Sequence, residues 1–261
     1  MGNIRSPAVA GMFYPGDAGE LKHMLDSMLQ HAKLKHIHPR AIIAPHAGYV
    51  YSGEIAASAY KELEDIKKDI QRVVLLGPSH RVPFVGCAVS DAEYFRTPLG
   101  DIALDTAAIK SLLQYSQVQV SAAAHAQEHS LEVHLPFLQT VLDEFTLVPI
   151  VVGDADAESV SEILEFFWQD KHTIFVISSD LSHYHDYATA IAIDEQTTSA
   201  IKHLQPENIS YEMACGRNPV NGLLKLAKKH GLKAVALDLR NSGDTAGSKD
   251  QVVGYGAYGF C

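Results

Sequence analysis

Four residues that can bind a metal ion or transfer a proton follow three short apolar runs of this sequence. His46 comes after the first run, His80 after the second, and Asp180 and His183 after the third. Neutral imidazole suits iron, copper and zinc, and two histidines with one further ligand leave coordination positions open. Cys215 is a further candidate, because a thiolate binds such metals. The residue types therefore favour a catalytic metal site over a structural one.

Each of these residues also has a simpler interpretation when it is taken alone. His46 suits a tight turn with its ring hydrogen-bonded, and Cys215 suits a small buried apolar position. Two apolar runs that each deliver a histidine after a Pro or Gly breaker, at His46 and His80, are more specific than either alone. The metal-site hypothesis therefore depends on these segments meeting in space.

The apolar runs have the pattern of central strands in a parallel sheet. The segments 41–44, 72–76 and 173–177 are apolar apart from their first residues Arg72 and Thr173, and they are followed by glycine, proline or serine. In open α/β sheets, ligands bind beyond the carboxyl ends of the strands. We therefore expect the side chains that follow these strands to lie along one edge of the sheet.

Helical patterns alternate with strand patterns along the chain. We expect helices at 18–31, 54–64, 106–115, 130–142, 157–169, 188–204 and 218–230, and a short one toward Met213. Further strands are expected at 85–90, 118–120, 146–152, 234–240 and 252–260. This alternation predicts an α/β fold with a largely parallel central sheet and helices on both faces. No internal repeat or boundary divides the chain, so residues 1–261 are predicted to form a single domain.

A second group of polar residues lies between the candidate metal ligands in the sequence. The histidines His129 and His134 are five apart, so the segment is not the zinc-protease pattern, which needs a spacing of four. On a helix, Glu128 and Glu132 share a face with His129 close by, and they either line a cleft and orient the ligating imidazoles or cap a helix with exposed charges. Tyr49 either forms a pocket wall or lies at the edge of the core.

Composition and charge restrict the classes of partner. The chain is 47% hydrophobic and 20% charged with a net charge of −10, which argues against nucleic acid and anionic membrane surfaces as partners. No apolar run approaches the roughly 20 residues that a membrane span needs. Cys87, Cys215 and Cys261 are odd in number and widely spaced, which indicates a reducing cytoplasm instead of a disulfide framework.

Six motifs in fixed order give the sequence a family resemblance that spans nearly the whole chain. They are Ala-Gly-Met-Phe-Tyr-Pro at 10–15, Pro-His-Ala-Gly-Tyr at 45–49, Gly-Pro-Ser-His at 77–80, Glu-His-Ser-Leu-Glu-Val-His-Leu-Pro at 128–136, Ser-Ser-Asp-Leu-Ser-His at 178–183 and Cys-Gly-Arg at 215–217. Together they resemble the Memo family, whose microbial members are also called AmmeMemoRadiSam system protein B.

The resemblance implies a fold and a ligand set. The Memo fold is similar to that of class III extradiol dioxygenases (the LigB-like fold), which are non-haem iron enzymes. By this resemblance His46, His80 and Cys215 build the metal pocket, with Asp180 and His183 beside them. The segment that ends at His183 also looks like the dioxygenase segment that carries the acid–base histidine.

One departure from the dioxygenases affects the expected metal and chemistry. Those enzymes complete their iron site with a glutamate, whereas this sequence has no obvious equivalent and offers the thiolate of Cys215. A sulfur ligand favours copper or zinc and changes the redox properties of iron. The expected cofactor is a divalent transition metal, with Fe(II) first and copper or zinc as alternatives.

Three functions follow from these residues. The first is a metal-dependent oxidoreductase with dioxygenase-like chemistry, in which His183 is the acid–base and Asp180 orients it or shares the metal. The second is a non-catalytic module that binds a small molecule or peptide in a vestigial site, and the third is a zinc hydrolase with the same ligands. The acidic surface suits a phosphopeptide poorly, because phosphate prefers arginine clusters. Residues expected to line or support the pocket are Tyr49, Glu128, His129, Glu132, His134 and Arg217.

Overall fold

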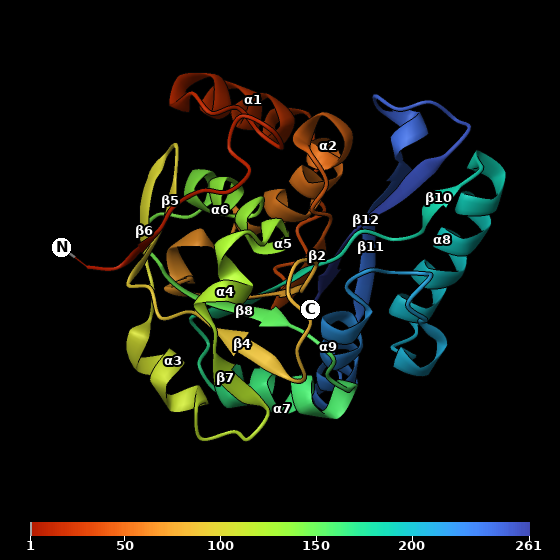
Figure 1. Cartoon of the computed structure of the whole chain (residues 1–261). Helices are drawn as coiled ribbons and strands as arrows, with labels where there is room; N and C mark the ends of the chain where they lie inside the picture. Colours follow the sequence, from red (N-terminus) through yellow and green to blue (C-terminus); the bar gives the residue numbers. More distant parts are fainter. Residues whose placement is uncertain (1) are drawn as a thin grey trace.

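The protein is described here by a computed structural model of residues 2–261, with a nine-stranded sheet at its centre (Figure 1). Met1, the first residue of the predicted domain 1–261, lies outside the described residues. The strand order is β10-β12-β2-β9-β3-β8-β4-β7, and β11 also pairs with β12. The four central strands run parallel, as their apolar sequences predict: β2 (Ala41–Ala44), β9 (Thr173–Ser178), β3 (Arg72–Pro78) and β8 (Thr146–Val152).

Antiparallel pairs extend this parallel centre on both sides. Strand β12 pairs with β2 on one side, while β4 pairs with β8 on the other and continues to the parallel β7. The bounds are Val252–Phe260 (β12), His183–His185 (β10), Ala234–Asn241 (β11), Cys87–Val89 (β4) and Val118–Val120 (β7). A separate small sheet contains β1 (Ile4–Arg5), β5 (Tyr94–Thr97) and β6 (Gly100–Ala103).

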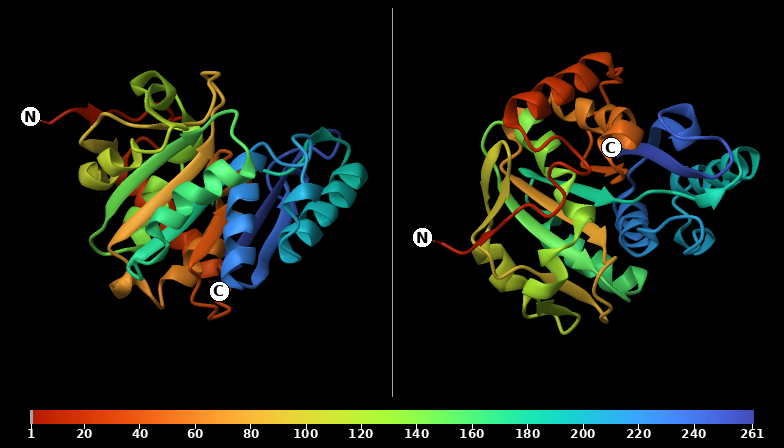
Figure 2. Two further views of the ribbon diagram at one scale, coloured as in Figure 1. Left: turned by 90° about the horizontal axis from the view of Figure 1, so that it is seen from below. Right: turned by 45° about the horizontal axis from the view of Figure 1, so that its top comes forward.

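Helices cover both faces of the large sheet, as two further views show (Figure 2). Helices α1, α2 and α6 pack together on one face, and α7 packs against α9 on the other. Strands β11 and β12 lie between α2 and α8 (Figure 1). The helix bounds are Ala18–His31 (α1), Tyr49–Tyr60 (α2), Thr106–Leu112 (α3), Ala122–Ala126 (α4), His129–Glu132 (α5), Leu135–Val141 (α6), Ala157–Trp168 (α7), Tyr187–Lys202 (α8) and Arg217–His230 (α9).

This arrangement confirms the predicted fold class. The chain is α/β, with parallel strands at the centre of its large sheet and helices on both faces. Buried apolar side chains from Val9 to Phe260 form one continuous cluster. In the part of the chain that the structure describes, no helix is long and apolar enough to cross a membrane.

Helix α2 begins at Tyr49, earlier than the predicted start at residue 54. Residues 49–53 were predicted to precede the helix, but they form its first turns, and Gly53 lies inside it. A Cβ atom at Gly53 would lie 2.7 Å from the Met28 sulfur, so glycine there lets α1 and α2 pack closely. The loop that carries His46 is therefore short and is fixed at both ends, by β2 and by α2.

The predicted helix at 130–142 is in fact two helices, α5 and α6. Glu128 caps α5, since its carboxylate accepts the backbone N–H of Ser130 at 2.9 Å. Pro136 lies in the first turn of α6, where its missing N–H leaves no helical hydrogen bond unmade. Glu128 lies before the first turn of α5, while Glu132 is its last residue.

The segment before α9 also differs from its prediction. The helix begins at Arg217, one residue before the predicted start at 218, with Gly216 as its N-cap. The Asn218 side chain donates its Nδ2–H to the Gly153 carbonyl at 2.9 Å. The short helix expected toward Met213 is a turn, preceded by a 3₁₀ turn at Pro206–Asn208. Other 3₁₀ turns span Lys61–Leu63, Lys67–Asp69 and Ser242–Asp244.

Candidate metal centre

His46 follows the end of β2, and its ring orientation is fixed by a chain of hydrogen bonds. Its Nδ1 lies 2.6 Å from the Ser178 hydroxyl, which donates its own proton to the Ser130 carbonyl at 2.6 Å. Because that proton is committed to Ser130, Ser178 accepts the Nδ1–H of His46. Burial, with the nearby imidazoles, lowers the pKa of His46 well below its usual value. His46 is therefore neutral, with the lone pair of Nε2 free to bind a metal.

His80 follows β3 and is oriented by a carboxylate. The Glu128 side chain accepts both the backbone N–H of His80, at 2.6 Å, and its Nδ1, at 2.9 Å. Burial alone would raise the pKa of Glu128, but its hydrogen bonds with His80 and Ser130 outweigh burial and lower the pKa to about 2. The ionised Glu128 therefore holds a proton on Nδ1 of His80 and leaves Nε2 free, as metal-binding histidines require.

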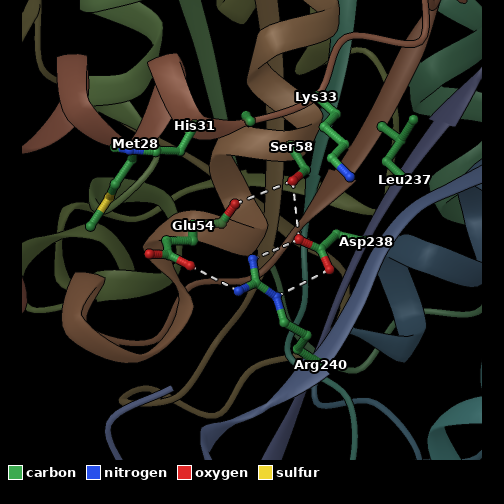
Figure 3. A pocket seen from close by; sticks show the side chains of 9 residues that line it. Met28, His31, Lys33, Glu54, Ser58, Leu237, Asp238 and Arg240 are labelled. Carbon is green, nitrogen blue, oxygen red and sulfur yellow. Dashed lines mark hydrogen bonds and ion pairs between the residues drawn. The ribbon is translucent and has the colours of Figure 1, made fainter. Parts of the chain in front are cut away.

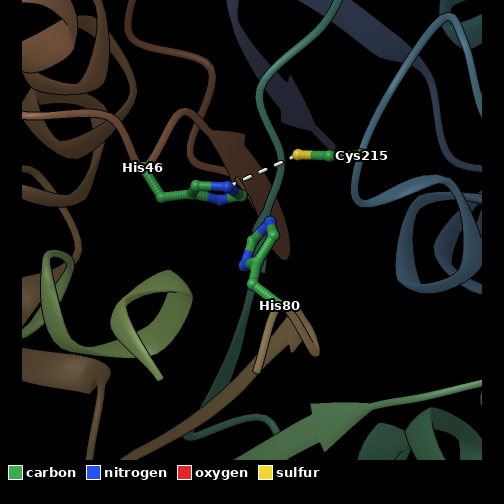
Figure 4. Close-up of side chains that lie close together, drawn as sticks. All are labelled: His46, His80 and Cys215. Atoms are coloured by element: carbon green, nitrogen blue, oxygen red, sulfur yellow. Dashed lines mark hydrogen bonds between the residues drawn. The ribbon is translucent and has the colours of Figure 1, made fainter. Parts of the chain in front are cut away.

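Cys215 brings a sulfur atom to these two imidazoles from the distant segment before α9. Its Sγ lies 3.4 Å from Nε2 of His46, and one ligand atom from each of His46, His80 and Cys215 lies within 4.8 Å of the others (Figure 4). Burial and the charge of Asp180 raise the pKa of the Cys215 thiol. A cation bound there would supply the positive charge that deprotonates a buried thiol. The three predicted ligands therefore meet in one place.

Asp180 lies beside this trio and positions the loop that carries His46. Its Oδ1 accepts the backbone N–H of His46 at 2.7 Å, and its Oδ2 lies 3.9 Å from Nε2 of the same residue. Burial raises the pKa of Asp180 to about 6, although these backbone hydrogen bonds oppose the shift. Asp180 is thus near enough to approach a bound ion, and it also shapes the loop.

His183 lies at the start of β10, in the segment that follows Asp180. Its Nδ1 donates to the Leu181 carbonyl at 2.8 Å, which leaves Nε2 as a proton acceptor. The ring is half-buried. Within residues 2–261 the side chain has no other hydrogen bond, so nothing there holds Nε2 away from a ligand.

His129 joins the two imidazoles as a third ring. Its ring centroid lies 4.6 Å from that of His80 and 5.5 Å from that of His46. Burial lowers the pKa of His129 to about 4, so the ring is neutral. Its buried Nδ1 has no hydrogen-bond partner in the described chain. The prediction that His129 lies close to the ligands agrees with this geometry.

Glu132 has a different environment from Glu128. Its buried carboxylate pairs with Arg5 and accepts the backbone N–H of Val9 at 2.9 Å and the Tyr14 hydroxyl at 2.6 Å. It therefore holds the N-terminal segment against α5 and makes no contact with the ligating imidazoles. The exposed charges of the alternative are wrong for both glutamates, since each is only 1% exposed, although Glu128 does cap the helix.

His134 and Tyr49 lie in the interior, away from the ligand atoms. Nδ1 of His134 is 2.7 Å from the Tyr60 hydroxyl, and the Tyr49 hydroxyl donates to the Val133 carbonyl at 2.6 Å. Of the two interpretations of Tyr49, the core position agrees with the structure. The structure likewise gives His134 a packing role instead of a place beside the metal ligands.

The buried His134 should make the protein less stable in acid. Burial lowers its pKa from 6.5 to about 3, so between these pH values the unfolded chain binds a proton that the folded chain does not. For this group the free energy of unfolding should fall by about 1.4 kcal/mol for each unit of pH lost in that window. Replacing His134 with Gln should make urea-unfolding stability less dependent on pH below about 6.5. An unchanged slope for H134Q would contradict the assignment.

A cavity of about 260 Å³ adjoins the trio. His80 and Cys215 contribute to its wall, and so does Arg217, the third residue of the Cys-Gly-Arg motif. Arg217 thus lies at the cavity, as expected of a pocket residue.

Ser178 and Ser130, which fix the His46 ring, were not among the predicted site residues. The sequence carries one relevant signal, since polar serines directly follow an apolar strand.

Replacing Ser178 with Ala should weaken metal binding about 10- to 100-fold, because His46 loses the hydroxyl that accepts its Nδ1–H and so fixes the tautomer with Nε2 free. Competition with a chromogenic chelator measures this. Ser182→Ala is the matched control, since the buried Ser182 hydroxyl has no partner within residues 2–261; equal affinities of the two variants would refute the role of Ser178.

Comparison with known proteins agrees with the six sequence motifs. A family model described as "Memo-like protein" matches residues 5–258. The chain belongs to the Memo family. It is 37% identical to a MEMO1 family protein of Aquifex aeolicus, with 97% of each chain covered, and 36% identical to one of Ignicoccus hospitalis, with 98% of each covered.

The fold of this Memo-family chain is also found in a solved structure with little sequence similarity. An uncharacterized protein from Escherichia coli K12 superposes with a TM-score of 0.57 at 13% identity, covering 82% of this chain and 98% of the other. At that identity the similarity concerns the fold alone.

Proposed function

We propose that this Memo-family protein binds one divalent transition-metal ion through His46, His80 and Cys215 and uses it for redox chemistry on a small molecule. The observation that carries the proposal is the compactness of the trio. Both imidazoles have Nδ1 occupied, by Ser178 and Glu128, so that both Nε2 atoms remain available beside the Cys215 sulfur. Two nitrogens and one sulfur suit Fe(II), copper and zinc, and three protein ligands leave a position open.

Fe(II) is the first choice, from the resemblance to extradiol dioxygenases, with copper and zinc as alternatives. A bound iron ion would supply one-electron and dioxygen chemistry. The chain's own residues would orient the ligands of the ion and accept a proton from the substrate. Glu128 and Ser178 fix the imidazoles, and the free Nε2 of His183 accepts a proton from a substrate hydroxyl. Because the thiol of Cys215 must stay reduced, a reducing cytoplasm is the expected location.

Nitric oxide tests the open coordination position without knowledge of the substrate. Anaerobic protein loaded with Fe(II) should bind one ion per chain, and nitric oxide should give the spin-resonance signal of an iron–nitrosyl complex. Oxygen uptake with catechol should then be seen with iron and not with zinc. Bound iron that takes up no nitric oxide would mean a closed site and would refute the redox proposal, whereas activity with zinc but not iron would favour hydrolysis.

The alternative of a non-catalytic binding module rests on the same cavity. At about 260 Å³ it is smaller than the roughly 300–1,000 Å³ of pockets that enclose drug-sized ligands. It suits a small molecule better than an extended peptide. Ligand binding that is equally strong in metal-free protein would favour this alternative.

A further inference from the structure

The cavity beside the trio has an unusual chemical lining. Its lining includes the apolar Val82, Pro83 and Phe84, two of the proposed metal ligands, His80 and Cys215, and the guanidinium of Arg217 from α9. A ligand in this cavity would therefore meet a cationic side chain and a metal-binding group at the same time.

Arg217 is a charged side chain in this lining that has no partner within residues 2–261. Its Nε is buried without a hydrogen bond, and its guanidinium forms no ion pair within residues 2–261. Its nearest aromatic contact is Tyr211, whose ring centroid lies 5.9 Å from Cζ. The exposed Asp154 shares the cavity but does not pair with it. Burying part of a guanidinium without an acceptor costs free energy, which a bound anion would recover.

A second hollow, of about 370 Å³ beside α2 and β11, shows the contrasting case (Figure 3). There Arg240 donates to Asp238 at 2.7 Å and to Glu54 at 2.8 Å, and the Ser58 hydroxyl also donates to Asp238. The guanidinium in that hollow is satisfied by the protein itself. Arg217 differs because no acceptor within residues 2–261 pairs with its guanidinium, so the acceptor would be a bound ligand.

The backbone on either side of Arg217 is fixed relative to the metal ligands. The Gly216 N–H donates to the Ser179 hydroxyl at 3.0 Å, and a Cβ atom at Gly216 would lie 2.4 Å from the Ser178 carbonyl oxygen. Asn218, on the other side, donates to the Gly153 carbonyl. Since Cys215 belongs to the same short segment, an anion held by Arg217 would lie in the cavity that Cys215 also lines.

We propose that Arg217 binds the carboxylate or phosphate of a small ligand whose apolar body lies along Val82, Pro83 and Phe84. A guanidinium fork matches either group with two parallel hydrogen bonds. A cavity of about 260 Å³ has room for a small body such as a single ring. This inference rests on the proposed function only for the role of the ligand as substrate; the anion site itself needs no metal.

Binding of simple aromatic anions tests the site. Titration calorimetry on the full chain, with and without Fe(II), should show benzoate or phenyl phosphate binding at least about tenfold more tightly than neutral benzamide, because only an anion pairs with Arg217. Whichever of benzoate and phenyl phosphate binds more tightly identifies carboxylate or phosphate as the group that the site prefers. Benzamide binding as tightly as both anions, or no anion binding at millimolar concentration, would overturn the proposal.

Variants locate the effect at Arg217. R217Q should lose at least about tenfold in anion affinity, and R217K should lose less because it keeps the charge without the fork. R240Q is the matched control, with unchanged anion affinity. Wild-type affinity in both Arg217 variants would overturn the proposal, and R217K remains informative where R217Q does not fold. Metal content measured on the same samples separates the two proposals: anion binding that depends on Arg217 in a chain that takes up no metal supports this site and refutes the metal centre.

Discussion

Replacing His46 with Gln should abolish metal binding, from one ion per chain to near zero after anaerobic loading and desalting. His46 Nε2 lies 3.4 Å from the Cys215 sulfur, and His46 is the most buried of the three ligands. Loss of a ligand should weaken affinity by more than about 100-fold, because removing a residue that only orients a ligand already costs 10- to 100-fold. Elemental analysis and chelator competition measure the loss.

The controls for this result are histidine and cysteine changes outside the site. His23→Gln on the exposed side of α1 should keep a full equivalent of metal, and so should Cys261→Ser, whereas Cys215→Ser should not. Thermal unfolding of each metal-free variant checks that the fold is intact. A full equivalent of tightly bound metal in H46Q would show that the ion lies elsewhere.

Replacing Glu132 with Gln should destabilise the protein by about 3–5 kcal/mol, since it leaves the buried Arg5 guanidinium without its charge partner. The amide also cannot accept all the hydrogen bonds that the carboxylate receives from Val9, Tyr14 and other groups of the N-terminal segment. Urea unfolding measures the change, and the melting temperature should fall by about 2–4 °C for each kcal/mol lost.

An exposed ion pair is the matched comparison for this change. Lys22 and Asp26 pair at 3.1 Å on the surface of α1, so Asp26→Asn should change stability by less than about 1 kcal/mol. A loss for E132Q as small as that for D26N would mean that the Glu132 cluster contributes little to stability.

The sequence predicted the strands of the sheet more closely than the helix boundaries. The runs within 41–44, 72–76 and 173–177 are apolar after Arg72 and Thr173 because both faces of these strands are covered, and such a run can be recognised from neighbouring residues alone. The start of α2 was missed because Gly53 is a packing contact with Met28, which depends on where α1 lies. A glycine in a turn and a glycine at a close helix contact look alike in one sequence.

The candidate site was predicted only in part, because some of its residues follow from local patterns and others depend on contacts between distant segments. The positions of His46 and His80 at strand ends follow from local patterns, and the place of Cys215 came from the family motifs. Periodicity could not separate Glu128 from Glu132, because Glu128 is the extended N-cap of α5 and bonds to His80, whereas Glu132 lies inside the helix and pairs with Arg5. The role of Ser178 depends on its contact with the Ser130 carbonyl across the fold.

The most direct test of the metal centre is X-ray absorption spectroscopy at the edge of the bound metal. The proposed ligand set predicts one sulfur scatterer from Cys215 and two imidazoles, from His46 and His80, around a single ion, with sulfur lost in Cys215→Ser. A spectrum with only nitrogen and oxygen neighbours, the same in the wild type and in C215S, would contradict the shared imidazole-and-thiolate site.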